Sequence, residues 1–207
     1  MKNLFKSLSV ICLALVLLCP LALVGCSKNY TINISIVEGS QGGYVYMKNI
    51  NGVSVLGDNT VKSGDKFEYF VTPKDGYVIS KILVDGKPQT DFDAEKGSYL
   101  YFEDVKKDHK VKVYFKAKTY VVSLYCKVSP AGGEFELFKT VDVEYGSALN
   151  LNNYGGEQAL WFVRENNVDT YLFDESDPDS NLLFVLDNVN VYCNKTAQDL
   201  EDMGVER

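Results

Sequence analysis

Side chains able to do covalent or ligand chemistry are few in this chain of 207 residues. His109 is the single histidine, so the chain alone can assemble neither a Ser–His–Asp unit nor a multi-histidine zinc site. The G-x-S-x-G elbow of hydrolases and the phosphate-binding P-loop are both missing from the sequence. We therefore expect no catalytic residues and no cofactor.

An acidic turn at 174–181 is the one segment with metal-ligand chemistry. Its carboxylates Asp174, Asp177 and Asp179 are hard oxygen ligands of the kind that calcium prefers. The turn lacks the ligand spacing and central glycine of an EF-hand loop, so a solvated hairpin tip is the competing interpretation. The acidic segment 91–95 is interpreted in the same way.

The thiol of Cys26 lies at the end of an export signal. Two lysines stand in the first six residues, and the apolar run 10–24 follows at once. This run is interrupted by Pro20 and is shorter than the about 20 apolar residues of a membrane-spanning helix, which is the pattern of a signal peptide. It ends in Leu-Val-Gly-Cys at 23–26, which resembles the bacterial lipobox.

The lipobox resemblance implies that a peptidase cuts between Gly25 and Cys26 and that diacylglycerol is attached to the Cys26 thiol. A small residue at Gly25 suits the narrow peptidase site, and only a thiol can form the thioether. Residues 1–25 are then removed, and the lipid on Cys26 holds the chain on the outer face of a membrane, since two or three acyl chains anchor durably. An ordinary secretory peptide with a chance cysteine is the alternative.

Short alternating runs separated by Gly, Asn, Asp and Pro fill the exported part of the chain. The clearest of them, which have the two-residue period of β strands, are 30–37, 66–71, 77–84 and 111–115. The 14 tyrosines and 11 phenylalanines suit half-buried sheets. Only one stretch looks helical, beginning with a Thr196 cap and ending at Gly204. The sequence therefore predicts a mainly β fold.

The second half of the exported chain repeats the spacing of the first. In each half a tyrosine, Tyr30 or Tyr120, is followed twelve and thirteen residues later by a pair of glycines. In each half a valine, Val61 or Val143, then stands three residues before a glycine. Shared spacing of this kind suggests two related modules.

The expected organisation is two small β-rich modules in tandem, with almost no linker between them. After the signal peptide, a short tether at 26–29 leads into a first module at 30–118. A second module follows at 119–195, and the tail at 196–207 contains the short helix.

Charge is unevenly distributed between the two halves. Residues 28–118 carry 14 basic and 12 acidic side chains, whereas residues 119–207 carry 5 basic and 16 acidic ones. The acidic half disfavours nucleic acid as a partner, because nucleic-acid binding needs a basic surface. It also disfavours flat contact with anionic lipid head groups. A solvated acidic surface that keeps a small domain soluble is the simpler interpretation.

Turn and strand motifs in the first module point to a known family. The turn glycine Gly64, the Pro-Lys-Asp-Gly-Tyr turn at 73–77, the glycine turn at 85–86 and the last strand at 111–115 come in the family's order. With these motifs, residues 60–118 resemble the divergent internalin-type B-repeat. The resemblance implies a surface spacer, adhesion or interaction element without catalysis.

The second module is more weakly similar to the parent B-repeat, a compact β-grasp-like fold. Val143-Glu-Tyr-Gly stands for the family's turn, Trp161-Phe162 for its core, and the run 189–193 for its closing strand. This sequence departs from the family because no glycine precedes Trp161 and Lys195 stands where the family has its closing tryptophan. The resemblance implies a β-grasp-like second module.

If the second module is β-grasp-like, its first and last strands are neighbours. Cys126 lies on the same strand face as Val122 and Leu124, and Cys193 lies on the same face as Val189 and Val191. Both thiols then point into one core, and export makes oxidation possible. A Cys126–Cys193 disulfide and two buried, unpaired thiols are equally compatible with the sequence.

Four tyrosines, Tyr44, Tyr46, Tyr99 and Tyr101, form either a contact surface for a glycan or protein or a set of cross-strand packing pairs. We expect a lipid-anchored, outward-facing binding, adhesion or structural protein on a bacterial membrane, with an unidentified surface protein or glycan as partner. A small-solute-binding lipoprotein is the main alternative, although it would need more helices. A glycan-active enzyme using two carboxylates is a further one.

Overall fold

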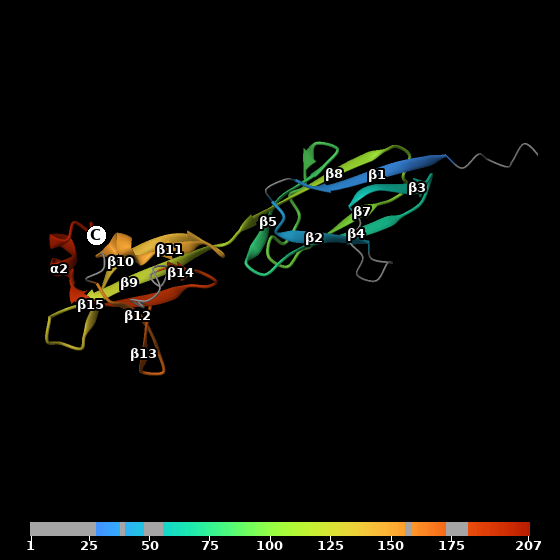
Figure 1. Cartoon of the computed structure of the whole chain (residues 1–207). Coiled ribbons are helices and arrows are strands. Elements are labelled where there is room, and N and C mark those ends of the chain that lie inside the picture. The colour runs from blue at the N-terminus through green and yellow to red at the C-terminus, as the bar shows by residue number, and fades with distance from the viewer. Residues whose placement is uncertain (1–27, 38–39, 48–55, 156–158, 173–181) are drawn as a thin grey trace, which may run out of the picture.

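The computed structural model describes residues 28–37, 40–47, 56–155, 159–172 and 182–207. The described residues form two β units arranged end to end along the chain (Figure 1). The mainly β fold predicted from the sequence is confirmed. In the parts of the chain that the structure describes, none of the helices has the length and apolar content that crossing a bilayer requires.

The first unit contains a five-stranded sheet. Its strands, in order across the sheet, are β3 (Gly57–Lys62), β1 (Asn29–Ile36), β8 (His109–Ala117), β5 (Tyr77–Val84) and β6 (Lys87–Pro88). β1 and β8 are parallel, while the other pairs are antiparallel. The first and last strands of the unit are therefore neighbours at the centre of the sheet.

A three-stranded sheet packs against this larger sheet. It consists of the antiparallel strands β2 (Gly43–Met47), β4 (Phe67–Pro73) and β7 (Ser98–Phe102), in that order. The core between the two sheets includes Ile32, Ile34, Val111, Val113 and Phe115 from the larger sheet and Val45, Tyr69, Val71 and Leu100 from the smaller one. Because side chains alternate along a strand, each sheet also presents an outer face.

The second unit repeats this central arrangement. Its main sheet has the order β10 (Phe135–Glu144), β9 (Thr119–Lys127), β15 (Val189–Thr196), β12 (Trp161–Glu165) and β13 (Val168–Tyr171). β9 and β15 are parallel neighbours. The expectation that the first and last strands of this module lie side by side is thus met.

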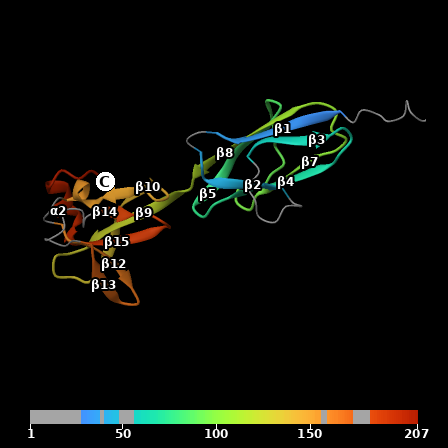
Figure 2. The same cartoon turned by 45° about the vertical axis from the view of Figure 1, so that its right-hand side comes forward.

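Smaller elements cover one face of the second sheet. They are the pair β11 (Ala148–Asn150) and β14 (Leu182–Phe184), the 3-10 turn η2 (Leu151–Tyr154) and the helix α2 (Ala197–Asp202). Trp161, Leu124, Leu151 and Leu200 are fully buried between these layers. Thr196 caps α2 reciprocally with Asp199, and α2 lies at the end remote from the first unit in both views (Figures 1 and 2).

The two sheets place corresponding residues in corresponding pairs. Tyr30 is the partner of Val61 in the first sheet, and Tyr120 is the partner of Val143 in the second. The glycine three residues after each valine has a positive φ, which is +88° at Gly64 and +74° at Gly146. The repeated spacing in the sequence therefore corresponds to equivalent positions in the two sheets.

Only Lys118 separates β8 from β9 at the junction of the two units. The Lys118 N–H donates to the Gly76 carbonyl (2.8 Å), and the Tyr145 N–H donates to the Lys118 carbonyl (2.9 Å). The Tyr145 ring lies so close to Gly76 that a Cβ there would be 2.3 Å from ring atoms, and Gly76 also has a φ of +74°. Gly76 is thus required both by the turn and by the contact between the units.

Candidate functional site

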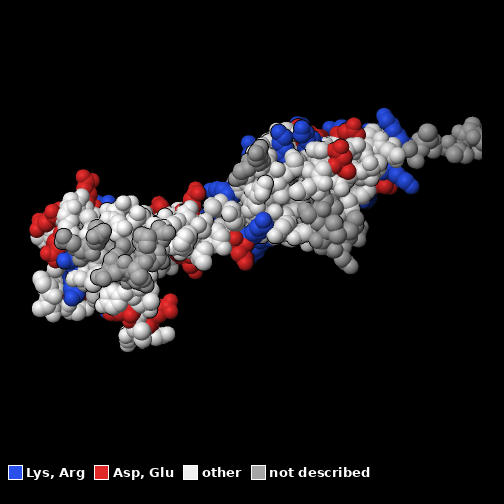
Figure 3. Space-filling view, viewed as in Figure 1, with Lys and Arg blue, Asp and Glu red and all other residues white. Residues whose placement is uncertain are grey.

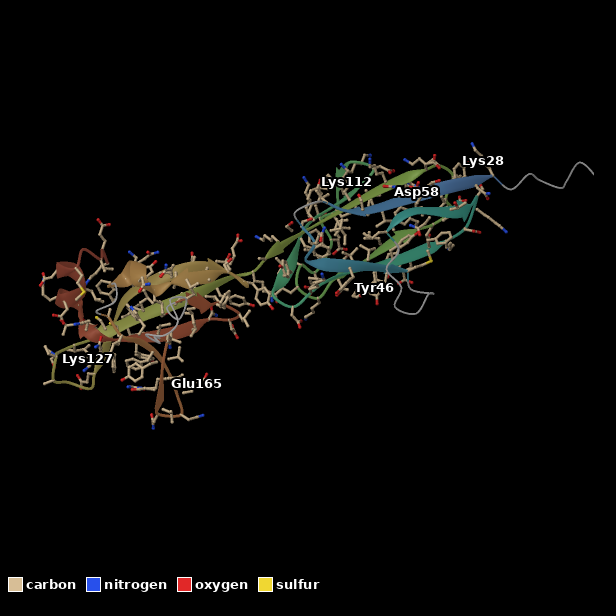
Figure 4. All side chains as sticks on the ribbon, viewed as in Figure 1. Lys28, Tyr46, Asp58, Lys112, Lys127 and Glu165 are labelled. Carbon is tan, nitrogen blue, oxygen red and sulfur yellow. The ribbon has the colours of Figure 1, made fainter. Side chains whose placement is uncertain are left out.

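The outer face of the three-stranded sheet is built from aromatic rings. We call this surface the aromatic face; it comprises Tyr44, Tyr46, Phe70, Tyr99 and Tyr101. The residues that alternate with them point into the core, so the aromatic residues are directed outward. Tyr44, Tyr99 and Tyr101 are 41%, 47% and 66% exposed. Figure 4 shows Tyr46 on the opposite side of the unit from Lys112 and Asp58.

The rings of the aromatic face lie on neighbouring positions of three paired strands. Phe70 is the register partner of both Tyr46 on β2 and Tyr99 on β7. Ring centroids lie 4.7 Å apart for Phe70–Tyr99, 6.2 Å for Tyr99–Tyr101 and 5.6 Å for Tyr44–Tyr46. Tyr99 is thus a cross-strand partner of Phe70 and an exposed ring at the same time, whereas Tyr44–Tyr46 and Tyr99–Tyr101 are pairs along one strand.

Gly97 lets the Phe70 ring lie close to the backbone at the start of β7. A Cβ at Gly97 would be 2.4 Å from the Val71 carbonyl oxygen and 2.9 Å from the Phe70 ring. Gly97 also has a φ of +107°, a backbone conformation that residues other than glycine rarely adopt. The absence of a side chain at this position keeps Phe70 in the aromatic face.

Polar groups border the aromatic face at two places. The Lys74 Nζ lies 4.9 Å from the centroid of the Tyr44 ring and donates to the Gln41 carbonyl (3.1 Å). Beside Tyr99 and Tyr101 lies an open pocket of about 310 Å³, which Gln89 and Asp91 also line. Exposed rings next to an amide and a carboxylate can stack on a ligand and hydrogen-bond to its hydroxyl groups.

A second aromatic cluster lies on the second unit, and no short-range pattern in the sequence predicts it. The Arg164 guanidinium carbon lies 5.1 Å from the Phe135 ring centroid and 5.5 Å from those of Phe162 and Tyr192. Arg164 also makes two hydrogen bonds to the Asp169 carboxylate, at 2.6 and 2.9 Å. Because the chain's own arginine covers these rings, the aromatic face of the first unit is the better candidate for a ligand.

His109 has a structural role at the end of the first unit. Its Nδ1 lies 2.9 Å from the Asp85 carboxylate, which also accepts from the Lys110 N–H (2.9 Å) and pairs with Lys107 (3.1 Å). Partial burial acts to raise the pKa of Asp85, but the hydrogen bonds from Lys110, Lys107 and His109 lower it to about 2. Asp85 therefore ties the β5–β6 turn to the start of β8.

The acidic segment 91–95 is also explained by local structure. The Asp93 carboxylate accepts from the N–H groups of Glu95 and Lys96, both at 2.9 Å. These hydrogen bonds, that from Lys96 first, lower the pKa of Asp93. Asp93 closes the turn before β7, as an aspartate at the start of a turn commonly does.

Several residues singled out in the sequence lie outside the described residues. They are the cleavage and lipid positions Gly25 and Cys26 and the acidic residues Asp174, Asp177 and Asp179. Across the ranges that are described, no three His, Cys, Asp or Glu side chains come together as ligands for a metal ion.

The chain was also compared with known proteins. No protein-family model matches it, and no curated protein matches it. Its function is therefore inferred from its own residues.

Cys126 and Cys193 lie in the core of the second unit as fully buried thiols. The last register pair before them on the parallel strands β9 and β15 is Tyr125–Tyr192. Neighbouring strands lie about 4.8 Å apart, a Cα separation that a disulfide can span. The register of β9 and β15 is irregular between Tyr192 and Thr196, and both cysteines are free in the structure. Burial raises the pKa of Cys193 to about 11 and also raises that of Cys126, so both stay protonated at neutral pH.

We expect Asp85→Asn to lower the free energy of unfolding by about 1 kcal/mol at pH 7, because the charged hydrogen bonds are weakened. Asparagine tolerates the left-handed backbone (φ +53°) at this position. Since the pKa of Asp85 is depressed in the folded state, its contribution is present above about pH 4 and is lost as the pH falls toward 2. Urea unfolding of both proteins at several pH values measures this.

Asp75→Asn is the control, because it removes the same charge from an exposed turn. An Asp85→Asn deficit that stays constant down to pH 2, or that equals the control, would contradict the role given to Asp85.

We expect Cys126 and Cys193 to be bridged in protein recovered from an oxidising compartment, because their strands are neighbours. The intact mass should then be lower by two hydrogens, and neither thiol should react with an alkylating agent after unfolding without reductant. Closing this loop should stabilise the unit by about 4 kcal/mol in the chain-entropy model, which unfolding with and without reductant measures. Complete alkylation of both residues in unreduced, unfolded protein would show that they remain thiols.

Proposed function

We propose that this protein is a lipid-anchored bacterial surface protein that binds a glycan on the aromatic face of its first unit, without catalysis. The observation that carries the proposal is the set of outward-facing rings beside a pocket with Gln89 and Asp91. Tyr44, Tyr99 and Tyr101 are exposed, and Tyr46 and Phe70 are half-buried. Such rings offer flat apolar surfaces, and the polar groups beside them can bond to sugar hydroxyls.

The size of the aromatic face favours a narrow ligand over a folded protein. β2 and β7 have five residues each. Three such strands cover about 17 by 14 Å, on the order of 240 Å², at the usual rise and strand spacing. A standard protein–protein interface buries about 800 Å² on each partner. An extended saccharide chain needs far less, so it fits this surface better.

The anchoring part of the proposal depends on the lipobox at 23–26 and the short tether after it. β1 begins at Asn29, only three residues after Cys26. Three residues span about 10 Å, so the lipid on Cys26 would hold the first unit beside the membrane. Figure 1 supports this placement, since β1 begins at the end of the first unit that is remote from the second.

The resemblance to B-repeat modules fits the same proposal. The two sheets have equivalent central strand orders and equivalent Tyr–Val pairs, which supports two related modules in tandem. Modules of that family act as surface spacers and adhesion elements, so a binding role beside a membrane agrees with the resemblance.

The two alternative functions have less support. A solute-binding lipoprotein needs an enclosed pocket, whereas the three pockets beside His109, Lys118 and Tyr99 are open to solvent. A carboxylate enzyme needs an acid whose pKa is raised. Every described carboxyl group with a clear shift has its pKa lowered: Asp85, Asp93, Asp169 and Asp199.

The glycan proposal predicts that Tyr99→Ala combined with Tyr101→Ala weakens binding by on the order of tenfold or more, since each ring contact contributes about 0.5–1.5 kcal/mol. Affinity electrophoresis against cellulose-derived, laminarin and mannan polysaccharides measures the change. Tyr171→Ala is the control, because Tyr171 is a 57% exposed tyrosine on the other unit. Equal binding by the double variant and the parent, or no binding by the parent to any neutral polysaccharide, would overturn the proposal.

The anchor proposal predicts that Cys26→Ser moves the protein from the membrane fraction to the soluble fraction and removes the acyl mass from its first residue. The physical reason is that a hydroxyl cannot form the thioether that carries the lipid. Cell fractionation and intact-mass measurement test this, with Cys126→Ala as a control that keeps the lipid. A mature chain that begins before Cys26, or that lacks acyl mass, would refute the anchor.

A further inference from the structure

A row of lysines occupies the outer face of the five-stranded sheet, on the side opposite the aromatic face. Lys110, Lys112 and Lys116 alternate along β8 with buried Val111, Val113 and Phe115, so they point outward together. Figure 3 shows basic side chains, with acidic ones among them, on this upper side of the first unit, and Figure 4 labels Lys112 there.

A fourth lysine from the next strand completes the row. Lys81 on β5 is the register partner of Tyr114, which lies between Lys112 and Lys116 on β8. Its Nζ lies 5.7 Å from the centroid of the Tyr114 ring. We call Lys81, Lys110, Lys112 and Lys116 the lysine row. At about 3.3 Å per residue, the row extends about 20 Å along β8.

Some lysines of the first unit are ion-paired with carboxylates of this chain, and others, like those of the lysine row, are not. Lys66, Lys106, Lys107 and Lys118 each pair with a carboxylate of this chain. None of the ion pairs between described residues includes a member of the row. Asp85 and Asp108 line the same pocket as Lys110 at one end of the row, whereas Lys81, Lys112 and Lys116 lie along the rest of it. Like charges along one sheet face repel one another, so an anionic ligand would relieve that repulsion.

We infer that the lysine row binds a linear anionic polymer of the cell surface, whose repeating charges are phosphodiesters or carboxylates. A straight line of point charges matches an extended chain with charges at intervals, and lysine binds such groups as a point charge without demanding one geometry. The row also runs away from the proposed anchor, since β8 is parallel to β1 and begins opposite Ile32, near the tether. A polymer rising from the membrane would lie along it.

The acidic second unit of a neighbouring copy is a less suitable occupant. If lipid anchors every copy through the same short tether, all first units stand at the same height beside the membrane. The second units then stand farther out, at the far end of each molecule (Figure 1). The lysine row of one copy and the acidic unit of another are therefore held at different heights.

The test measures binding of the full chain, reconstituted in neutral phosphatidylcholine vesicles, to fluorescent polyphosphate and to polygalacturonate. The two probes separate phosphate from carboxylate recognition. The variant Lys110→Gln, Lys112→Gln and Lys116→Gln should bind tenfold or more weakly, because each lysine near an anionic surface contributes about fivefold. Binding by the parent should also fall as ionic strength rises.

The matched control is Lys66→Gln, Lys96→Gln and Lys106→Gln, which removes the same charge elsewhere on the first unit. It should keep at least half of the parent's affinity. Equal losses in the two triple variants would show that net charge is sufficient, and would overturn the inference. So would failure of the parent to bind either polymer at low salt.

Two further measurements distinguish the other occupants. If the lysine variant loses attraction only to vesicles containing anionic lipid, while polymer binding is unchanged, the row serves the bilayer and the inference is wrong. If the parent associates with itself and polymer does not compete, the row serves a second copy and the inference is again wrong. The inference uses the outward placement in the proposed function, but neutral-polysaccharide binding can fail without affecting it.

Discussion

The parallel pairing of the first and last strands is the constraint on which each unit depends. A parallel pair cannot be joined by a tight turn, so the chain between β1 and β8, and between β9 and β15, has to leave the sheet and return. In the first unit the intervening chain forms the three-stranded sheet, which covers the core. In the second unit it supplies β11, β14 and η2, and α2 follows afterward. The same pairing places β8 at the centre of one sheet, and after Lys118 the chain continues into β9, an inner strand of the next sheet.

The two outer faces of the first unit follow from this arrangement together with strand alternation. Each sheet buries one side against the other, so every second residue of β4 and β8 faces outward. On the smaller sheet these positions are mostly aromatic, although Glu68 and Thr72 of β4 are among them. Along β8 they are three lysines and Tyr114. One small sandwich therefore offers two surfaces of different chemistry, one suited to neutral sugar rings and the other to anionic groups. Their separation on opposite sides means that neither ligand would have to displace the other.

The sequence predicted features that depend on short-range patterns and missed those that depend on register. The run 77–84 coincides with β5, and Thr196 caps α2, because period and capping chemistry are local. Phe70 was not singled out, because its place between Tyr46 and Tyr99 exists only when three strands pair in one register. The cluster around Arg164 was missed for the same reason, since its rings come from β10, β12 and β15. The lysines of β8 were recognisable as an outward face, but Lys81 joins them only through the pairing of β5 with β8.

The contacts at Lys118 hold together two units that differ in net charge. Two backbone hydrogen bonds and the Tyr145 ring, which also packs on Tyr77 with centroids 5.8 Å apart, leave little freedom at the junction. Residues 119–207 carry 16 acidic and 5 basic side chains, while residues 28–118 are nearly balanced. A membrane surface rich in anionic groups repels the former more than the latter. If the junction is stiff and the proposed anchor holds the first unit at the membrane, this repulsion favours an orientation of the whole molecule in which the second unit points away from the membrane. The aromatic face and the lysine row would then both face sideways, and the row would run outward from the proposed anchor.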